Sequence, residues 1–188
     1  MKVTISGPPG SGKTTIAGLL SEKLGMEVIT GGMIFRGYAE ELGITLSELG
    51  KRAEAEEDFD RKLDMYQLEV LKTKDNIIVE SRLSGWLCHI NGIRAFKIFL
   101  KADDSVRIKR IESSLEEREG EQHGDIHKSV KERELSEWKR YNKYYNIDFN
   151  DVSIYDAVID SSQKLPNEIV GVIIADLDIW KGTEGKIH

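Results

Sequence analysis

Residues 7–14 read Gly-Pro-Pro-Gly-Ser-Gly-Lys-Thr, and this stretch decides the fold of the chain. It matches the phosphate-binding pattern G-x-x-x-x-G-K-S/T, in which x is any residue. The run before it, residues 2–6, is short and β-branched and predicts a buried strand. Residues 14–24 carry apolar side chains at helical spacing and predict a helix that stops at Gly25. A strand before the loop and a helix after it are the context that a phosphate-binding loop requires.

The residue types in this loop suit a bound polyphosphate. Glycines let successive backbone N–H groups turn inward around the anion, and the following helix presents its positive end to the same charge. Lys13 would place a point charge on the β- and γ-phosphates, and the Thr14 hydroxyl would ligate Mg²⁺. A GTPase would need the sequence N-K-x-D, but Asn142-Lys143 is followed by two tyrosines, which favours ATP as the ligand. The residues expected to contact ATP are Gly7, Pro8, Pro9, Gly10, Ser11, Gly12, Lys13, Thr14 and Thr15.

Strand-like and helix-like stretches alternate along the rest of the chain. Further strands are predicted at residues 27–29, 76–79, 96–100 and 157–159. Helices are predicted after the caps Thr30 and Thr45, over residues 58–74, 103–117 and 130–145, and from Pro166. In the helix over residues 58–74, we expect Leu63, Tyr66 and Val70 to face inward. This alternation predicts an α/β three-layer sandwich with a five-stranded, mainly parallel sheet flanked by helices.

Composition and charge narrow the class of protein. The chain has 188 residues, which corresponds to one domain at the usual ~100–200 residues per domain. Its formal charge is −6, and an acidic chain is repelled by nucleic acid and by anionic lipid. The single cysteine, Cys88, allows no internal disulfide, and the first residues lack the apolar stretch of a signal peptide. We therefore expect a cytoplasmic monomer that acts on small molecules, with no nucleic-acid or membrane partner.

Two clusters of residues that follow predicted strands are candidates for binding a phosphate acceptor. The first, residues 30–36, combines a predicted helix N-terminus with Arg36, although an ordinary capped helix with a surface arginine has the same pattern. The second, residues 80–86, lies at the edge of the sheet where α/β proteins bind ligands. There Arg82 would present a planar fork to a phosphate and Glu80 would order Mg²⁺-bound water. A turn with a solvated arginine is the alternative.

The third cluster lies on the charged helix predicted over residues 130–145. Arg133, Glu137 and Arg140 stand at i, i+4 and i+7, which places them on one helix face. They form either a surface ion-pair stripe or a set in which guanidiniums contact phosphates and the carboxylate accepts a ribose hydroxyl. The polar stretch over residues 119–125, with two glycines, predicts a loop or flap. The arginines that lead into it, candidates for a lid that closes and excludes water, are Arg107, Arg110 and Arg118.

Five segments stand in a fixed order along the chain: GPPGSGKTT, GGMIFR, ESRLSGW, KERELSEWKRY and SIYDAVIDSS. This ordered set, which runs from about residue 2 to residue 173, resembles the cytidylate kinases, and most closely their short archaeal type. The resemblance implies ATP-dependent phosphorylation of CMP and dCMP, with Mg²⁺. It also implies a single nucleoside monophosphate kinase domain over residues 1–188. Its parts would be a core at about 1–30, 75–110 and 150–180, a helical acceptor arm at about 31–74 and a lid at about 110–130.

The resemblance also implies roles for individual residues. Arg36 and Arg82 would hold the phosphate of CMP, and Glu137 would hold its ribose. The catalytic residues would be Lys13, Arg82, Arg133 and Arg140. The CMP-binding residues, with two carboxylates of the arm included as base readers, would be Thr30, Gly31, Arg36, Asp60, Asp64, Arg82, Arg133 and Glu137.

The two carboxylates enter because this chain departs from the family pattern. Bacterial members read cytosine partly with an Asp directly after the arginine that corresponds to Arg82, but here that position is Leu83. Asp60 and Asp64 are the natural alternatives, since a carboxylate accepts a hydrogen bond from the cytosine N4 amino group.

Two other interpretations stay open. One is a kinase of the same fold for adenylate, uridylate, shikimate or a sugar acid. Two arginines aimed at an acceptor phosphate favour a nucleotide over the other acceptors. The other is an ATP-driven assembly factor for RNA or ribosomes. The acidic charge and the lack of basic or aromatic-rich tails argue against that second class.

Overall fold

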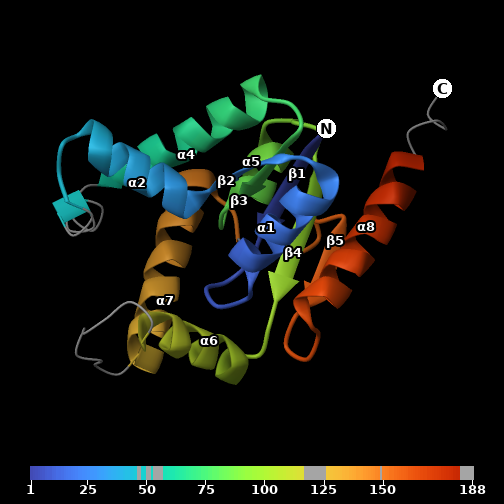
Figure 1. Ribbon diagram of the computed structural model, residues 1–188. Coiled ribbons are helices and arrows are strands. Elements are labelled where there is room, and N and C mark those ends of the chain that lie inside the picture. The colour runs from blue at the N-terminus through green and yellow to red at the C-terminus, as the bar shows by residue number, and fades with distance from the viewer. Residues whose placement is uncertain (46–47, 50–51, 53–56, 117–125, 149, 183–188) are drawn as a thin grey trace.

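A computed structural model of the protein describes residues 1–45, 48–49, 52, 57–116, 126–148 and 150–182 (Figure 1). Its strands are β1 (Lys2–Ser6), β2 (Glu27–Thr30), β3 (Ile77–Glu80), β4 (Phe96–Lys101) and β5 (Ala157–Asp160). Its helices are α1 (Lys13–Leu24), α2 (Gly31–Glu41), α4 (Glu57–Thr73), α5 (Ser84–Ile90), α6 (Asp104–Glu116), α7 (Ile126–Tyr145) and α8 (Pro166–Gly182). Among the residues described, no helix is long and apolar enough to cross a membrane.

The predicted caps set the ends of several elements. Gly25 ends α1 in the left-handed conformation, with φ of 62°, which glycine adopts without strain. The Thr30 hydroxyl accepts a hydrogen bond from the N–H of Met33 at 3.1 Å and caps α2. Thr45 and Glu48 form the capping box, in which each side chain accepts from the other's N–H, at 2.8 and 3.2 Å. These sequence predictions are confirmed.

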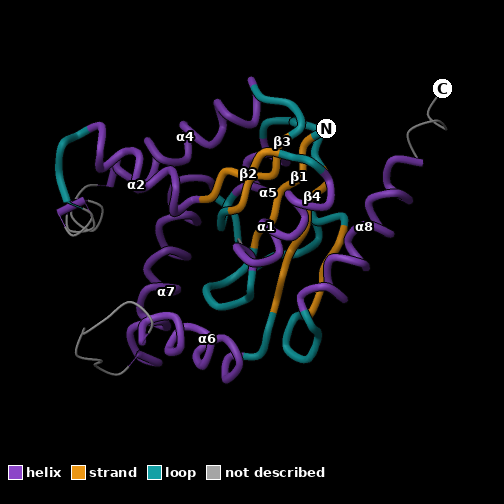
Figure 2. The backbone as a smooth tube through the Cα atoms, viewed as in Figure 1, coloured by secondary structure: helices purple, strands orange, loops and turns teal. Residues whose placement is uncertain are grey.

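The five strands form one parallel sheet in the order β2-β3-β1-β4-β5 (Figure 2). The chain leaves β1 for β2 on one side of the sheet and returns to reach β4 on the other side. Ligands of open α/β sheets bind at the carboxyl edge where the strand order reverses in this way. Because β1 is central, the loop that follows Ser6 emerges at this point, between the ends of β3 and β4.

Helices cover both faces of the sheet, and each face has its own apolar core. α1 and α8 pack on one face, while α4, α5 and α7 contribute to the core on the other. Alternation along β4 sends Ile98 and Leu100 into the first core and Phe99 into the second. The predicted three-layer α/β sandwich is confirmed, and Figure 1 shows α7 running from beside α6 to the α2–α4 pair.

The structure also corrects the sequence analysis in places. Tyr66 was expected to face inward, but it is 54% exposed. The inward positions of α4 near it are occupied by two polar residues, Asp64 and Gln67, which an apolar pattern does not reveal. Helix α5 was not predicted, since seven residues are too few to show a helical period. Strand β3 starts one residue late because Asn76 turns through φ of 55°. The predicted flap at residues 119–125 lies outside the described residues.

Candidate active site

The loop between β1 and α1 has the glycine geometry that its sequence predicts. Gly7, Gly10 and Gly12 have φ of 145°, 73° and 87°, which other residues rarely adopt. The loop also packs directly on backbone: a Cβ at Gly7 would lie 2.1 Å from the carbonyl oxygen of Leu100. A Cβ at Gly10 would lie 2.4 Å from the carbonyl oxygen of Arg107, so the backbone of neighbouring residues leaves no room for a side chain at Gly7 or Gly10. It leads into the N-terminus of α1, the positive end of the helix.

Lys13 is the first residue of α1, and its ammonium lies folded over the loop. Its Nζ donates a hydrogen bond to the carbonyl of Pro8 at 2.8 Å. Burial lowers the pKa of Lys13 to about 8, while nearby Glu80 raises it and nearby Arg82 lowers it. The cation thus sits in a poorly hydrated place beside other charges. A phosphate bound there would stabilise the ammonium in place of the water that burial has removed.

Thr14 and Glu80 bring two side-chain oxygens together beside Lys13. Glu80 ends β3 and is buried, and its Oε2 accepts a hydrogen bond from Thr14 Oγ1 at 3.2 Å. A hydroxyl and a carboxylate oxygen at this separation are donors of the kind that Mg²⁺ prefers, with phosphate oxygens and water completing its shell. In the part of the chain that the structure describes, no three His, Cys, Asp or Glu side chains form a metal cluster. The two oxygens of Thr14 and Glu80 match the ligand preference of Mg²⁺, the cation that the sequence predicts.

Arg82 and Glu137 bring the second and third predicted clusters together. Arg82 follows β3, Glu137 lies midway along α7, and their side chains form an ion pair. The two side chains are only 15% and 8% exposed. Both also influence the charge of Lys13, which places them near the loop. A buried pair of this kind fixes the orientation of the guanidinium, because removal of either partner leaves an uncompensated charge.

The N-terminus of α2 abuts the same region. A Cβ on Gly31 would lie 3.6 Å from the Cβ of Ser81, so the first and second clusters are neighbours. Arg36 is exposed, and its guanidinium folds back over the start of the helix, where a Cβ on Gly32 would lie 3.4 Å from Nη1. The hydroxyl of Thr30, engaged as the cap, lies beside it. The start of α2, which follows β2, thus lies beside the residues that follow β3.

Helix α4 contacts α7 through polar side chains. Asp64 is 5% exposed, and its Oδ2 accepts a hydrogen bond from the Tyr145 hydroxyl at 2.9 Å. The guanidinium of Arg61 lies over the ring of Tyr144, 5.6 Å from its centroid. Asp60 lies in α4, but its side chain is outside the described residues.

The remaining predicted arginines fall into three groups. Arg140 on α7 donates from Nη1 to the hydroxyl of Ser136 at 2.5 Å. Arg133 lies on the same helix, but its side chain is outside the described residues, as is all of Arg118. Arg107 and Arg110 on α6 both reach the phosphate-binding loop, and Arg110 donates to the carbonyl of Gly10 at 3.3 Å.

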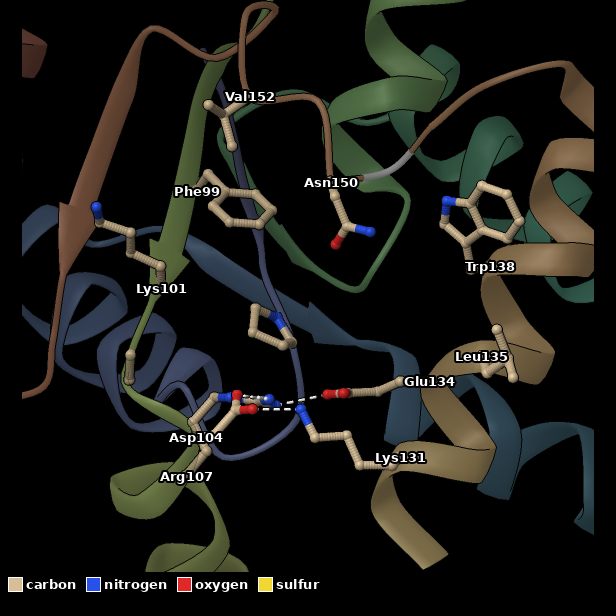
Figure 3. Close-up of a pocket in the computed structure, with 12 residues that line it drawn as sticks. Phe99, Lys101, Asp104, Arg107, Lys131, Glu134, Leu135, Trp138, Asn150 and Val152 are labelled. Carbon is tan, nitrogen blue, oxygen red and sulfur yellow. Dashed lines mark hydrogen bonds and ion pairs between the residues drawn. The ribbon is translucent and has the colours of Figure 1, made fainter. Parts of the chain in front are cut away.

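Arg107 stands at the centre of a charge network that joins the loop to two helices (Figure 3). Its guanidinium donates to the carbonyl of Pro9 at 3.0 Å, to Glu134 of α7 at 2.5 Å and to Asp104 of its own helix at 2.6 Å. Lys131 of α7 forms an ion pair with Asp104. The starts of α6 and α7 are therefore tied both to each other and to the loop.

A cavity of about 770 Å³ opens beside this network. Figure 3 shows Phe99 and Trp138 on opposite sides of it, with the side chain of Asn150 between them. Its lining includes Pro8 of the loop but neither Lys13 nor Arg82. The residues that line it are Pro8, Phe99, Lys101, Ala102, Asp104, Arg107, Lys131, Glu134, Leu135, Trp138, Asn150 and Val152. The cavity thus flanks the loop rather than joining the Lys13–Arg82 region.

Two residues at the loop escaped the sequence analysis. Glu134 holds Arg107, and Ser161, the first residue after β5, hydrogen-bonds the backbone of Ser11 at 2.9 Å. A usable signal existed for Ser161, since it follows a predicted strand at the same edge of the sheet as the loop. Glu134 lies one helical turn before Glu137, but a charged residue on a charged helix carries no distinguishing pattern.

The strand order and the glycine-rich loop after the central strand define a P-loop α/β protein, and two kinases are among the solved structures with this fold. A gluconokinase from Sinorhizobium meliloti superposes with a TM-score of 0.66 at 16% identity, covering 100% of this chain and 97% of its own. A shikimate kinase from Bacteroides thetaiotaomicron superposes with a TM-score of 0.63 at 16% identity, covering 95% and 98%. These likenesses establish the fold.

Sequence comparison then gives the family. The cytidylate kinase-like family matches residues 2–163. A cytidylate kinase of Natronomonas pharaonis is 44% identical over 174 residues, which cover 92% of this chain and 87% of the relative. One of Sulfolobus acidocaldarius is 40% identical over 174 residues, covering 93% and 92%. The chain belongs to the cytidylate kinase-like family, as the ordered motifs predicted.

Proposed function

We propose that the protein transfers the γ-phosphoryl group of ATP to CMP, and also to dCMP, giving the diphosphate and ADP. Membership of the cytidylate kinase-like family supports the reaction and the acceptor. The observation that carries the proposal is the meeting of a donor site and an acceptor site. Thr14, next to Lys13, bonds Glu80 at 3.2 Å, and Arg82, two residues after Glu80, forms an ion pair with Glu137 of α7.

The donor half of the site is the loop. Backbone N–H groups of residues 10–15 bind the phosphates of ATP, since Pro8 and Pro9 carry no N–H, and Lys13 stabilises the charge on the transferred group. Thr14 is a ligand of Mg²⁺, and Glu80 orders its shell, an assignment supported by their 3.2 Å contact. Bound Mg²⁺ neutralises charge on the β- and γ-phosphates. Catalysis is then mainly positioning and charge stabilisation.

The acceptor half is built around Arg82. Its fork binds the phosphate of CMP, with Arg36 approaching from the start of α2 beside Thr30 and Gly31. Glu137 holds Arg82 in place and accepts a ribose hydroxyl, which its burial next to that guanidinium supports. No general base is needed, because the attacking phosphate oxygen is already ionised.

Four further residues complete the assignment. Arg133 and Arg140 contact the phosphates from α7, one turn before and one turn after Glu137 along the same face. Asp60 reads the N4 amino group of cytosine. Asp64 is its fallback, although the Tyr145 hydroxyl already occupies one of its oxygens.

We assign residues 31–74 to an acceptor arm and residues 110–130 to a lid, around a single core. Two contacts support these divisions: Asp64 of α4 bonds Tyr145 of α7, the helix that also carries Glu137, and Arg110, the first residue of the proposed lid, bonds the loop at Gly10. The buried thiol of Cys88 suits the reducing cytoplasm.

Steady-state ADP production tests the proposal. The purified protein is assayed with ATP and Mg²⁺ against CMP, dCMP, UMP, AMP, shikimate and gluconate, with an acceptor-free reaction as the background. We expect CMP and dCMP to give the highest kcat/KM. A higher kcat/KM with AMP or a sugar acid would replace the proposed acceptor. ATP hydrolysis stimulated by RNA, without turnover of any small acceptor, would indicate the assembly-factor class instead.

A further inference from the structure

Three consecutive carbonyls of the phosphate-binding loop are held by side chains from outside the loop. The carbonyl of Pro9 accepts from Arg107 at 3.0 Å, and that of Gly10 accepts from Arg110 at 3.3 Å. The carbonyl of Ser11 accepts from the hydroxyl of Ser161 at 2.9 Å. The arginines belong to α6, whereas Ser161 comes from the far end of the sequence, directly after β5.

Holding these carbonyls determines where the loop's N–H groups point. In a trans peptide the C=O and N–H bonds point in opposite directions across one rigid plane. The N–H that shares a plane with the Ser11 carbonyl is that of Gly12, the residue before Lys13. Because the Ser11 carbonyl points toward Ser161 at the end of β5, the Gly12 N–H points the opposite way, away from β5. A group aimed away from the protein scaffold in this loop is a donor for phosphate oxygens.

Ser161 is built into this position by all of its polar groups. It is 1% exposed, and its N–H donates to the carbonyl of Lys101 at 2.8 Å, which anchors it to β4. Its carbonyl accepts from Nη2 of Arg110 at 2.7 Å, and its hydroxyl accepts from Nη1 at 3.0 Å. The same hydroxyl then donates to Ser11, so a single oxygen links the guanidinium and the loop.

We infer that Ser161 is a positioning residue for the donor nucleotide: its hydroxyl fixes the Ser11–Gly12 peptide and holds Arg110 against the loop. The inference rests on the proposed ATP site and adds a residue to which no role has been assigned. Ser161 acts through the loop and does not touch the acceptor region around Arg82. Its loss should therefore weaken ATP and ADP and leave CMP binding unchanged.

The test compares Ser161→Ala with Ser162→Ala. Ser162 is a matched control, since its hydroxyl accepts from the N–H of Asp103 at 2.9 Å in the same turn. Calorimetric Kd values for ADP and for CMP are measured separately, together with kcat/KM for ATP. We expect Ser161→Ala to weaken ADP binding and to lower kcat/KM for ATP about 5- to 50-fold, as one buried group left without its partner does. The Kd for CMP should stay within twofold, and Ser162→Ala should match the wild type.

Two results would overturn the inference: an ADP Kd within twofold of wild type, or equal weakening of ADP and CMP. An equal loss in Ser162→Ala would do the same, since it would indicate a general effect of the turn. If Ser161→Ala does not fold, Ser161→Cys keeps the volume with a weaker donor and is judged by the same ADP-to-CMP comparison. The ADP measurement needs no turnover, so a protein that fails to phosphorylate CMP would contradict the proposed function without deciding this inference.

Discussion

Lys13 should destabilise the empty protein, and its removal should therefore stabilise the fold while it stops the reaction. Burial lowers the pKa of Lys13 from 10.5 to about 8, a shift equivalent to about 3 kcal/mol. That figure is the upper limit, because the side chain is half-buried and Lys13→Met also loses the hydrogen bond to Pro8, which contributes about 1 kcal/mol. We expect Lys13→Met to raise the free energy of unfolding by roughly 1–2 kcal/mol at pH 7 without nucleotide.

The pH dependence has a definite sign. Below about pH 8 the folded protein carries the desolvated charge and bears its full cost. Between about pH 8 and 10.5 the unfolded chain binds a proton that the folded chain has released, so stability rises with pH. Denaturant unfolding of wild type and Lys13→Met across pH 7–10 measures this as a difference that shrinks as the pH rises.

The same variant should lose about 10²–10³ in kcat, the usual effect of removing one preorganised donor. A Lys13→Met protein less stable than wild type at pH 7, or a stability difference that does not change with pH, would refute the electrostatic reasoning. A fall in kcat of less than tenfold would refute the role in transfer.

Three further variants test the acceptor and metal assignments. Arg82→Lys keeps the charge but loses the fork, so kcat/KM for CMP should fall tenfold or more while KM for ATP stays within twofold; equal losses would move Arg82 to the donor side. Glu80→Gln should raise the Mg²⁺ concentration for half-maximal activity about tenfold without changing the metal-free Kd of ADP, and an unchanged Mg²⁺ requirement would remove Glu80 from the metal site. Asp60→Asn should narrow the CMP-to-UMP ratio of kcat/KM by roughly 5–100-fold; an unchanged ratio in both this variant and Asp64→Asn would leave base reading to other groups.

Periodicity and caps made most of the fold predictable. The strands are short apolar runs bounded by turns, and capping residues mark the helix ends: Thr30 at the start of α2 and Gly25 at the end of α1. Helix α5 failed this approach because its residues are buried nearly all round, so no polar face marks its period. The prediction for Tyr66 was wrong because a polar residue, Asp64, faces inward on α4. Burial of Asp64 is possible because the Tyr145 hydroxyl, distant in sequence, donates a hydrogen bond to its carboxylate.

The candidate site divides in the same way. The loop is contiguous, so its glycines, Lys13 and Thr14 could be read from one stretch of sequence. Arg82 and Glu137 could be named as separate candidates, but their ion pair joins residues 55 positions apart and depends on how α7 packs. Ser161 acts on a backbone carbonyl, and any polar side chain after any strand could do so. Only the parallel packing of β4 and β5 decides that this one does.

Helix α7 has a mechanical consequence for how the two substrates communicate. Its 20 residues make a rod about 30 Å long. In its middle, one turn apart, Glu134 binds Arg107, which holds the loop, and Glu137 binds Arg82; at its end Tyr145 binds Asp64 of α4. A stiff rod fastened at three points cannot tilt at one of them without moving the others. A change in the tilt of α7 at the Tyr145–Asp64 contact would therefore move Arg82 and the phosphate-binding loop with it.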